Sequence, residues 1–447
     1  MKAILHKTIT IIQCALIIFL LSIATHVCSQ TVDSTFSEKF SFHTQTTVVS
    51  QYKPAFYAKY TGTNSLLPQE ESQVSITATW YTGVALWRNA TIFINPEIAG
   101  GSGLSSAFGV ANSTNGETFR VGTPDPKLYL ARIFFRQLFP LSKNTVYQPA
   151  SFNQLAGDVP ESYVAITAGK IDIVDYFDNN RYAHDPRTQF LSWGLMNNGA
   201  WDYPANTRGY TPSIVLEYVM SKSELRYGIS LVPLMANGND MDWKIGKASS
   251  HSLEYTRRYS IKGMPGTIRL LTYFTTANMG NYNQSIALNP TAPSIISTRK
   301  YGNTKYGFGI NAEQSITNEL GVFLRAGWDD GNNETWAFTE VDRSMSVGIS
   351  SDGYKWKRPM DHVGLAYVSS GLSRPHRTYL KDGGLGFMLG DGNLNYGWEH
   401  LAELYYSAEM MKNSIYLTGT YQFIVNPGYN KDRGPVNVFS VRVHARI

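Results

Sequence analysis

The sequence predicts an all-β protein, a transmembrane antiparallel β-barrel of about 16 strands, and three observations lead to that prediction. Strand-length segments of alternating apolar and polar residues recur along the chain. Aromatic residues make up 13% and charged residues only 16%, whereas soluble domains carry roughly 25% charged residues. After residue 29, no apolar run approaches the ~18–20 residues that a spanning helix requires. A closed barrel is then the membrane-spanning structure that fits.

The N-terminal segment has the features of a secretory signal peptide. A basic start at Lys2 and Lys7 precedes an apolar stretch over residues 9–23, and Val27-Cys28-Ser29 offers a cleavage site before Gln30. We therefore expect residues 1–29 to be a cleaved signal peptide and residues 30–447 to form one barrel domain in the cell outer membrane. Acylation of Cys28 is the less favoured alternative, because lipoprotein signals usually carry Gly or Ala before that cysteine.

The cysteine content excludes several kinds of site. Cys14 and Cys28 both lie within the expected signal peptide. The exported chain is therefore expected to have no disulfide, no thiolate metal site and no cysteine nucleophile. We expect no metal and no cofactor.

The last strand, within Gly434–Ile447, shows the alternation most clearly. Phe439, Val441 and Val443 fall on one face, and Arg442 and His444 fall on the other. The same pattern recurs over residues 214–220, 225–231, 306–313, 322–329, 402–410 and 415–425. In a barrel, the apolar face meets lipid and the polar face meets an aqueous lumen.

The length of the chain sets the width of the barrel. Strands of ~10 residues with their connections give about 16 strands, although 14 or 18 would also fit. A barrel of that size holds an aqueous channel. Residues Thr31–Gln69 are expected to precede the first strand, and they are too few for the plug domain of an energised transporter.

Several segments together resemble the carbohydrate-selective porins, the OprB-type family. These segments are Thr91–Gly103, Gly169–Leu191, Trp201–Gly209, Thr339–Ser344 and Tyr421–Val436. The resemblance implies a 16-stranded outer-membrane barrel that passes small sugars by passive diffusion. It departs at Ile447, where outer-membrane barrels usually end in an aromatic residue that the assembly machinery recognises.

Partners follow from the same resemblance and from the charge. The resemblance implies mono- or disaccharides as solutes, with outer-membrane lipid and the barrel-assembly machinery as partners, and it leaves a monomer and a homotrimer open. A net charge of +5 without a dense Lys/Arg stripe gives no reason to expect nucleic acid.

Residues Asn179–Tyr210 are the candidate for a constricting loop folded into the lumen. Asp185 followed by Pro186 predicts a helix start, and Thr188–Met196 is expected to form a short helix. A long loop with its own helix and aromatic residues is often functional. The alternative is a loop that stays outside and closes the mouth of the barrel.

Candidate pore-lining residues combine charges with aromatic rings. Such a mixture suits sugars, because rings pack against C–H faces while charged groups hydrogen-bond hydroxyls. The candidates are Arg132, Arg136, Glu217, Arg226, Arg325, Asp329, Glu403, Tyr405 and Arg442 in the strands, with Arg181, Arg187 and Trp193 in the loop. Charged residues that merely solvate the wall would give the same pattern. Mixed signs argue against strong anion or cation selectivity.

Two other functions stay open at this stage. One is a general, non-selective diffusion porin. The other is a barrel enzyme that hydrolyses lipids or glycosides, with Ser440 and His444 or with Glu403 and Glu409 as its reactive groups. Lumen lining explains those pairs more simply, and the chain lacks the common catalytic motifs. We expect no catalytic residues.

Overall fold

The computed structural model describes residues 38–118 and 124–447. The expected signal peptide, residues 1–29, lies outside the described residues, so its cleavage stays a prediction.

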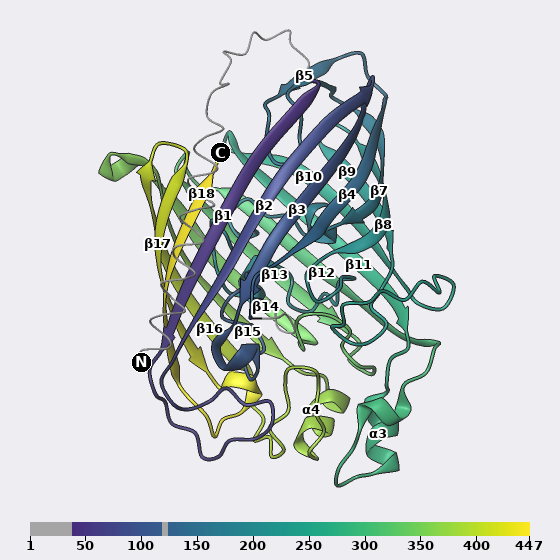
Figure 1. Ribbon diagram of the computed structural model, residues 1–447, viewed down its shortest axis with the longest axis vertical. Helices are drawn as coiled ribbons and strands as arrows, with labels where there is room; N and C mark the ends of the chain where they lie inside the picture. The colour runs from purple at the N-terminus through teal and green to yellow at the C-terminus, as the bar shows by residue number, and fades with distance from the viewer. Residues whose placement is uncertain (1–37, 119–123) are drawn as a thin grey trace.

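Within the described residues, sixteen antiparallel strands form a closed barrel (Figure 1). The wall consists of β1 (Phe40–Lys53), β2 (Glu71–Trp87), β3 (Ala90–Gly101), β4 (Lys127–Pro140), β7 (Tyr163–Ile171), β8 (Thr211–Val219), β9 (Ser223–Ser230), β10 (Ser249–Ile261), β11 (Met264–Ala277), β12 (Asn303–Ser315), β13 (Leu320–Asp329), β14 (Arg343–Gly353), β15 (Arg358–Gly371), β16 (Glu399–Met411), β17 (Ile415–Val425) and β18 (Val436–Arg446). Each strand pairs with its neighbours along the wall, and β1 closes the circle against β18, with Val48 opposite Val443. The predicted fold class is confirmed.

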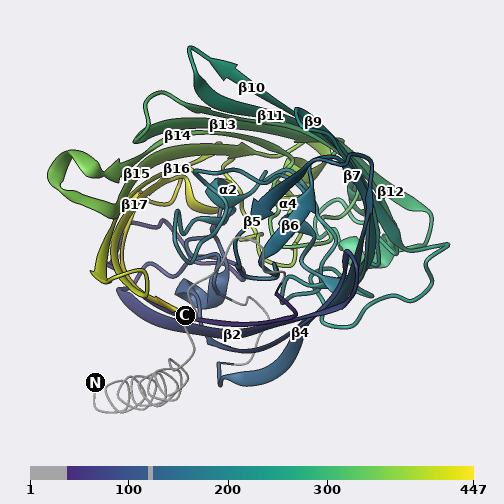
Figure 2. The same cartoon turned by 90° about the horizontal axis from the view of Figure 1, so that it is seen from above.

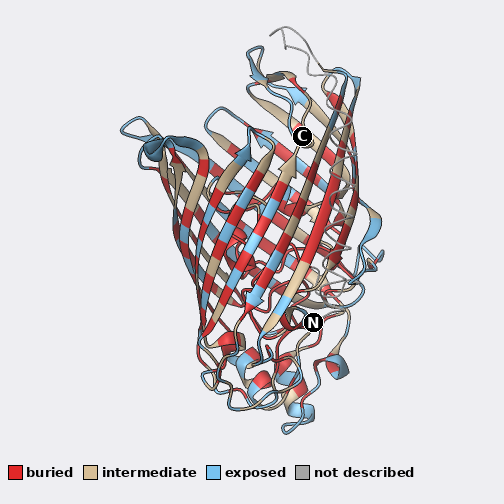
Figure 3. Cartoon of the chain, turned by 60° about the vertical axis from the view of Figure 1, so that its left-hand side comes forward, coloured by how far each residue is buried: buried red, intermediate tan, exposed pale blue. Residues whose placement is uncertain are grey.

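The alternation along the strands has the predicted orientation. In β18, Phe439 and Val441 are 48% and 52% exposed on the outside, whereas Arg442 and His444 are buried on the inside. Figure 3 shows the same banding of buried and exposed residues along the wall. The outer surface is therefore an apolar face suited to lipid, and the polar residues point inward.

The first strand lies earlier than the sequence suggested. β1 begins at Phe40, inside the stretch that was expected to precede the wall, and it pairs with β2 from Phe40 to Lys53. The expectation was wrong because Thr44 and Thr46 lie on its outer face while Val49 is buried on the inner face. Polar residues on the outer face and an apolar residue on the inner face weaken the alternation expected of a barrel strand. Pairing with β2 and β18 stabilises β1 nevertheless.

The two ends of the barrel differ in their connections. Most connections at the end of the barrel where the C-terminus lies are short, whereas those at the other end are long. The long connections carry η1 (Leu104–Ala107), η2 (Ile173–Asp175), α2 (Trp193–Met196), α3 (Tyr282–Leu288), η3 (Ile295–Thr298), α4 (Arg374–Lys381) and η5 (Pro427–Tyr429), and η4 (Tyr354–Trp356) lies in a short turn. In outer-membrane barrels the short turns are periplasmic, so α3 and α4 mark the external end. None of the helices in the described ranges is long and apolar enough to cross a membrane.

One connection at the periplasmic end is long. It runs from Leu141 to Ser162 between β4 and β7, and it contains a separate hairpin of β5 (Thr145–Gln148) and β6 (Gly157–Pro160). Seen along the barrel, this hairpin lies across the interior rather than beside the wall (Figure 2).

The connection between β7 and β8 folds into the lumen, as predicted. Phe177, Phe190 and Trp201 of this loop are at most 1% exposed. The expected helix over Thr188–Met196 is wrong, because only Trp193–Met196 is helical. A longer helix would use the Leu191 and Ser192 amides in its own hydrogen bonds. Instead, these amides donate to Glu403 of the barrel wall, at 2.6 and 2.9 Å.

The loop rests against one side of the barrel. Arg325 of β13 donates to the Leu195 carbonyl at 2.9 Å and pairs with Asp178 at 3.1 Å. Beside it, a Cβ on Gly327 would lie 1.9 Å from Asn198 Oδ1, so the loop needs a glycine there. Because the loop binds β10–β13, β16 and β18, the remaining space lies along β1–β4 and β7–β9.

Candidate functional site

A cavity of about 1490 Å³ lies inside the barrel. Its lining comes from β1–β4 and β7–β9, from the loops that follow β3 and β7, and from the Leu141–Ser162 segment. It extends from Glu38 and Trp87 at the periplasmic end to Thr207–Tyr210, directly before the external end of β8.

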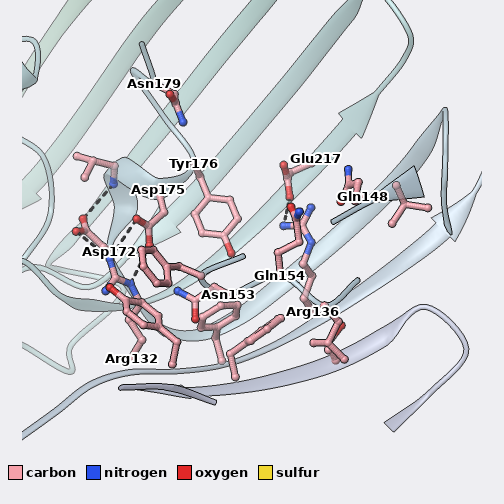
Figure 4. Close-up of a pocket in the computed structure, with 18 of the residues that line it drawn as sticks. Arg132, Arg136, Gln148, Asn153, Gln154, Asp172, Asp175, Tyr176, Asn179 and Glu217 are labelled. Carbon is pink, nitrogen blue, oxygen red and sulfur yellow. Dashed lines mark hydrogen bonds and ion pairs between the residues drawn. The ribbon is translucent and has the colours of Figure 1, made fainter. Parts of the chain in front are cut away.

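A cluster of paired charges, here called the eyelet, lines the outer part of this cavity. Its members are Glu97, Glu117, Arg132, Asp172, Asp175, Arg187 and Tyr210. Arg132 of β4 holds two carboxylates of the β7–β8 loop: its Nε lies 2.8 Å from Asp175 Oδ2, and its Nη2 lies 3.3 Å from Asp172 Oδ2 (Figure 4). Two arginines therefore meet four carboxylates in one section of the cavity.

The second arginine, Arg187, comes from the β7–β8 loop. Its Nε lies 3.0 Å from Glu117 Oε2, and its Nη2 lies 3.3 Å from Glu97 Oε2. These bonds tie the loop to β3 and to the β3–β4 loop. The guanidinium is thus fixed in place before any solute arrives, which lowers the entropic cost of binding.

Two tyrosines bind the carboxylate of Glu97. Tyr210 donates a hydrogen bond to Glu97 Oε1 at 3.0 Å, and Tyr129 donates to the same oxygen. The Arg132 guanidinium lies over the Tyr210 ring at 5.0 Å, a cation–π geometry. The eyelet thus offers aromatic surface next to charged hydrogen-bonding groups.

One carboxyl of the eyelet titrates near neutral pH. Burial and the neighbouring Asp175 charge raise the pKa of Asp172 to about 7, against the opposing effect of Arg132. Burial also raises the pKa of Glu117, although Arg187 opposes it. The charge of the eyelet therefore depends on pH in the physiological range.

Nearer the periplasm, the cavity wall carries a second set of pairs. Arg136 Nη1 of β4 lies 2.7 Å from Glu217 Oε1 of β8, and Arg226 Nε of β9 lies 2.9 Å from Glu217 Oε2. Figure 4 shows Arg136 and Glu217 facing the hairpin residues Gln148 and Gln154. We call this part of the cavity the vestibule.

The structure divides the predicted site residues into two groups. Six line the cavity: Arg132, Arg136, Arg187, Trp193, Glu217 and Arg226. The other six do not line it: Arg181, Arg325, Asp329, Glu403, Tyr405 and Arg442.

Most of this second group connects the wall to the loops. Arg442 donates to the Pro186 and Gln189 carbonyls, and the Tyr405 ring meets Phe190 edge-on at 4.9 Å. Asp329 pairs with Lys305 of β12 at 3.3 Å, whereas Arg181 is exposed. Arg325 and Glu403 hold the β7–β8 loop as described above. The alternation correctly predicted that the strand residues of this group face the interior of the barrel. They do not reach the cavity, because loops such as the β7–β8 loop lie between them and it.

Sequence reasoning missed Glu97, Glu117, Asp172 and Asp175. Glu97 is the one acidic residue in the apolar strand β3, and its inward parity was a usable signal. Glu117, in contrast, lies in the eyelet because the β3–β4 loop also folds inward. A loop has no alternating pattern from which this position could be predicted. Among the residues that the structure describes, no group of His, Cys, Asp or Glu is arranged to hold a metal ion.

Comparison with known families settles the class of protein. The model of the carbohydrate-selective porin, OprB family, matches residues 63–446. The chain belongs to this family. It is therefore a channel-forming porin of the outer membrane rather than an enzyme.

Solved structures support the fold of this porin. The high-pH structure of OprB from Pseudomonas putida superposes with a TM-score of 0.69 at 16% identity, covering 92% of this chain and 94% of that chain. The outer membrane channel DcaP of Acinetobacter baumannii gives a TM-score of 0.50 at 9% identity, over 93% and 100% of the two chains. A search of curated protein sequences returned no match.

Proposed function

We propose that this porin passes small uncharged saccharides by passive diffusion through the cavity, with the eyelet as its selective section. The observation that carries the proposal is the composition of the eyelet. Two arginines and four carboxylates lie there beside the ring of Tyr210, and Tyr129 donates to the Glu97 carboxylate.

A saccharide suits this section chemically. Its hydroxyls both donate and accept hydrogen bonds, so they can bind arginine and carboxylate groups at once. Its C–H faces can pack on tyrosine rings. Arg132 Nη1 is buried and has no hydrogen-bond partner among the described residues.

The charges of the eyelet also favour neutral solutes. A strongly anion- or cation-selective pore needs one sign of charge to dominate its constriction. Here each arginine lies within 3.3 Å of two carboxylates, so the arginines compensate about half of the negative charge and no ring of a single sign forms. A neutral polyol can bind both kinds of group at little cost in hydration, an anion meets an excess of carboxylates, and a cation meets carboxylates that arginines already bind.

Liposome swelling and planar-bilayer recordings test the proposal. We expect glucose and maltose to enter faster than uncharged polyols of equal size, and to reduce the open-channel current. Arg187→Ala removes the partner of Glu97 and Glu117, so the maltose concentration for half-block should rise about tenfold or more, as for the loss of one charged hydrogen-bonding group.

Leu404→Ala is the matched control, because Leu404 is exposed on the outer face of β16. It should leave the block unchanged. Uptake rates that follow solute size alone, with no current block by either sugar, would indicate a general diffusion porin instead.

A further inference from the structure

The Leu141–Ser162 segment covers the periplasmic mouth of the cavity. Among the connections at this end, it alone within the described residues carries its own hairpin, β5–β6. Figure 2 shows β5 and β6 in the middle of the barrel outline. A turn that only joins β4 to β7 would not need this length, because barrel turns on this side are short.

Specific contacts hold the segment inside the barrel. Leu155 packs against the buried cluster that contains Phe93 and Phe134. The Ala156 amide donates to Glu38 Oε2 at 2.8 Å, and the Glu38 amide donates to the Ala156 carbonyl at 2.9 Å. A Cβ on Gly83 of β2 would lie 2.8 Å from Leu155 Cδ1, so this strand leaves room for the segment.

The tip of the segment presents an aromatic ring and amides to the cavity. Phe152 stacks on Tyr81 of β2 with ring centroids 4.5 Å apart. Asn153 and Gln154 follow it along the chain and also line the cavity (Figure 4). Asn153 adopts a φ of 54°, and its buried Oδ1 has no hydrogen-bond partner among the described residues. An acceptor left this way costs free energy unless a hydroxyl or water binds it.

The opposite wall of the vestibule provides complementary groups. Arg136 pairs with Glu217 at 2.7 Å, and the Arg136 guanidinium lies 5.9 Å from the Tyr176 ring centre. Arg132 and Arg136 share the inner face of β4, so four residues at ~3.3 Å each separate the eyelet from the vestibule by about 13 Å. The cavity of about 1490 Å³ also exceeds the ~300–1,000 Å³ of ordinary small-molecule sites.

We propose that Phe152, Asn153 and Gln154, together with Arg136 and Glu217, form a second saccharide-binding site at the periplasmic end. This inference rests on the proposed function. The Phe152 ring contacts the C–H face of a sugar, and the amides and the ion pair bind its hydroxyls. A saccharide that leaves the eyelet therefore binds once more before it reaches the periplasm.

The test measures maltose block of single channels in planar bilayers, with maltose added to either side. In Phe152→Ala/Asn153→Ala, the half-blocking concentration from the periplasmic side should rise about tenfold, as for the loss of one hydrogen bond and one ring contact. Block from the external side should change less, because maltose reaches the intact eyelet first. Val146→Ala is the control, since Val146 lies on the same hairpin but is exposed outside the cavity.

Gln154→Ala provides a milder variant if the double variant does not fold, as judged by heat-modifiable gel mobility. Its half-blocking concentration should rise about threefold from the periplasmic side. If both sides respond identically, or if the variants match Val146→Ala, the second site is excluded while the eyelet proposal stands. If maltose does not block the unmodified channel at all, the proposed function itself fails.

Discussion

Asp172 is an eyelet residue whose charge changes near neutral pH. It lies directly after β7, and its carboxylate meets Arg132 at 3.3 Å. Its pKa of about 7 means that the carboxyl is neutral below that pH and negative above it. The eyelet therefore gains one negative charge as the pH rises through neutrality.

We expect the preference of the channel for cations over anions to increase between pH 6 and pH 8. The reversal potential in a KCl gradient measures this preference directly. Asp172→Asn should hold the reversal potential at its low-pH value throughout, because the amide does not titrate. A pH dependence that persists in this variant would assign the titration to another group.

Lys305 is the centre of a buried charge cluster at the external end of the barrel. Its Nζ lies 3.3 Å from Asp329, 3.7 Å from Asp202 and 3.8 Å from Asp342, and its side chain is fully buried. Asp342 also accepts a hydrogen bond from the Ser373 amide that precedes α4. The cluster thus joins β12, β13, the β7–β8 loop and the connection between β15 and β16 that contains α4.

Lys305→Met should destabilise the barrel by about 3–5 kcal/mol, because it leaves several buried carboxylates without their cation. Thermal loss of the β-sheet circular dichroism signal in detergent measures the effect. Lys300→Met alters an exposed lysine at the external end and should be neutral. Equal stability of the two variants would mean that the carboxylates are compensated by other groups.

At the scale of elements, the β7–β8 loop decides where the channel runs. Its side chains and backbone bind β13, β16 and β18, through Arg325, Glu403 and Arg442. Asn198 fits between two glycines of the wall, since Cβ atoms on Gly309 and Gly327 would lie 2.2 and 1.9 Å from its side chain. The wall is shaped to receive this loop.

Gly327→Val should push the loop away from the wall and enlarge or destabilise the channel. Overpacking of this kind costs about 1–3 kcal/mol, and single-channel conductance with its open-channel noise should rise. Gly419→Val is the matched control, because nothing lies within 4 Å of a Cβ at that strand position. An unchanged conductance in Gly327→Val would show that the loop does not depend on this contact.

At the scale of the whole molecule, the barrel depends on the pairing of its first and last strands. Val48 of β1 lies opposite Val443 of β18, and Val441 lies two residues away on the same face. The Cβ atoms of directly paired residues lie ~4.5–5.5 Å apart. Cysteines at positions 48 and 443 can therefore form a disulfide.

We expect Val48→Cys/Val443→Cys to cross-link under mild oxidation and to keep its channel conductance. Val48→Cys/Val441→Cys should cross-link much less, because the diagonal pair is ~7–8 Å apart. The mobility of heated, non-reduced samples on gels distinguishes the two. Preferential cross-linking of the second pair would place the closing strands in a different register.

Local periodicity in the sequence determined the barrel. In β8, β9, β12, β13, β16, β17 and β18, outward apolar residues alternate with inward residues that are mostly polar, and a period of two is a local property of the chain. β1 escaped this signal, since threonines lie on its outer face and Val49 on its inner face. The inward parity of Arg132, Arg136, Glu217 and Arg226 also followed from the strands alone.

Only the tertiary structure decided which inward residues meet the cavity. Arg132 and Arg325 have the same parity and the same charge, yet Arg132 lines the eyelet and Arg325 holds the loop. That difference depends on where the β3–β4 and β7–β8 loops fold, which long-range contacts with the wall determine. Alternation specifies the face of a strand on which a side chain lies, whereas packing of distant segments specifies what fills the space in front of it.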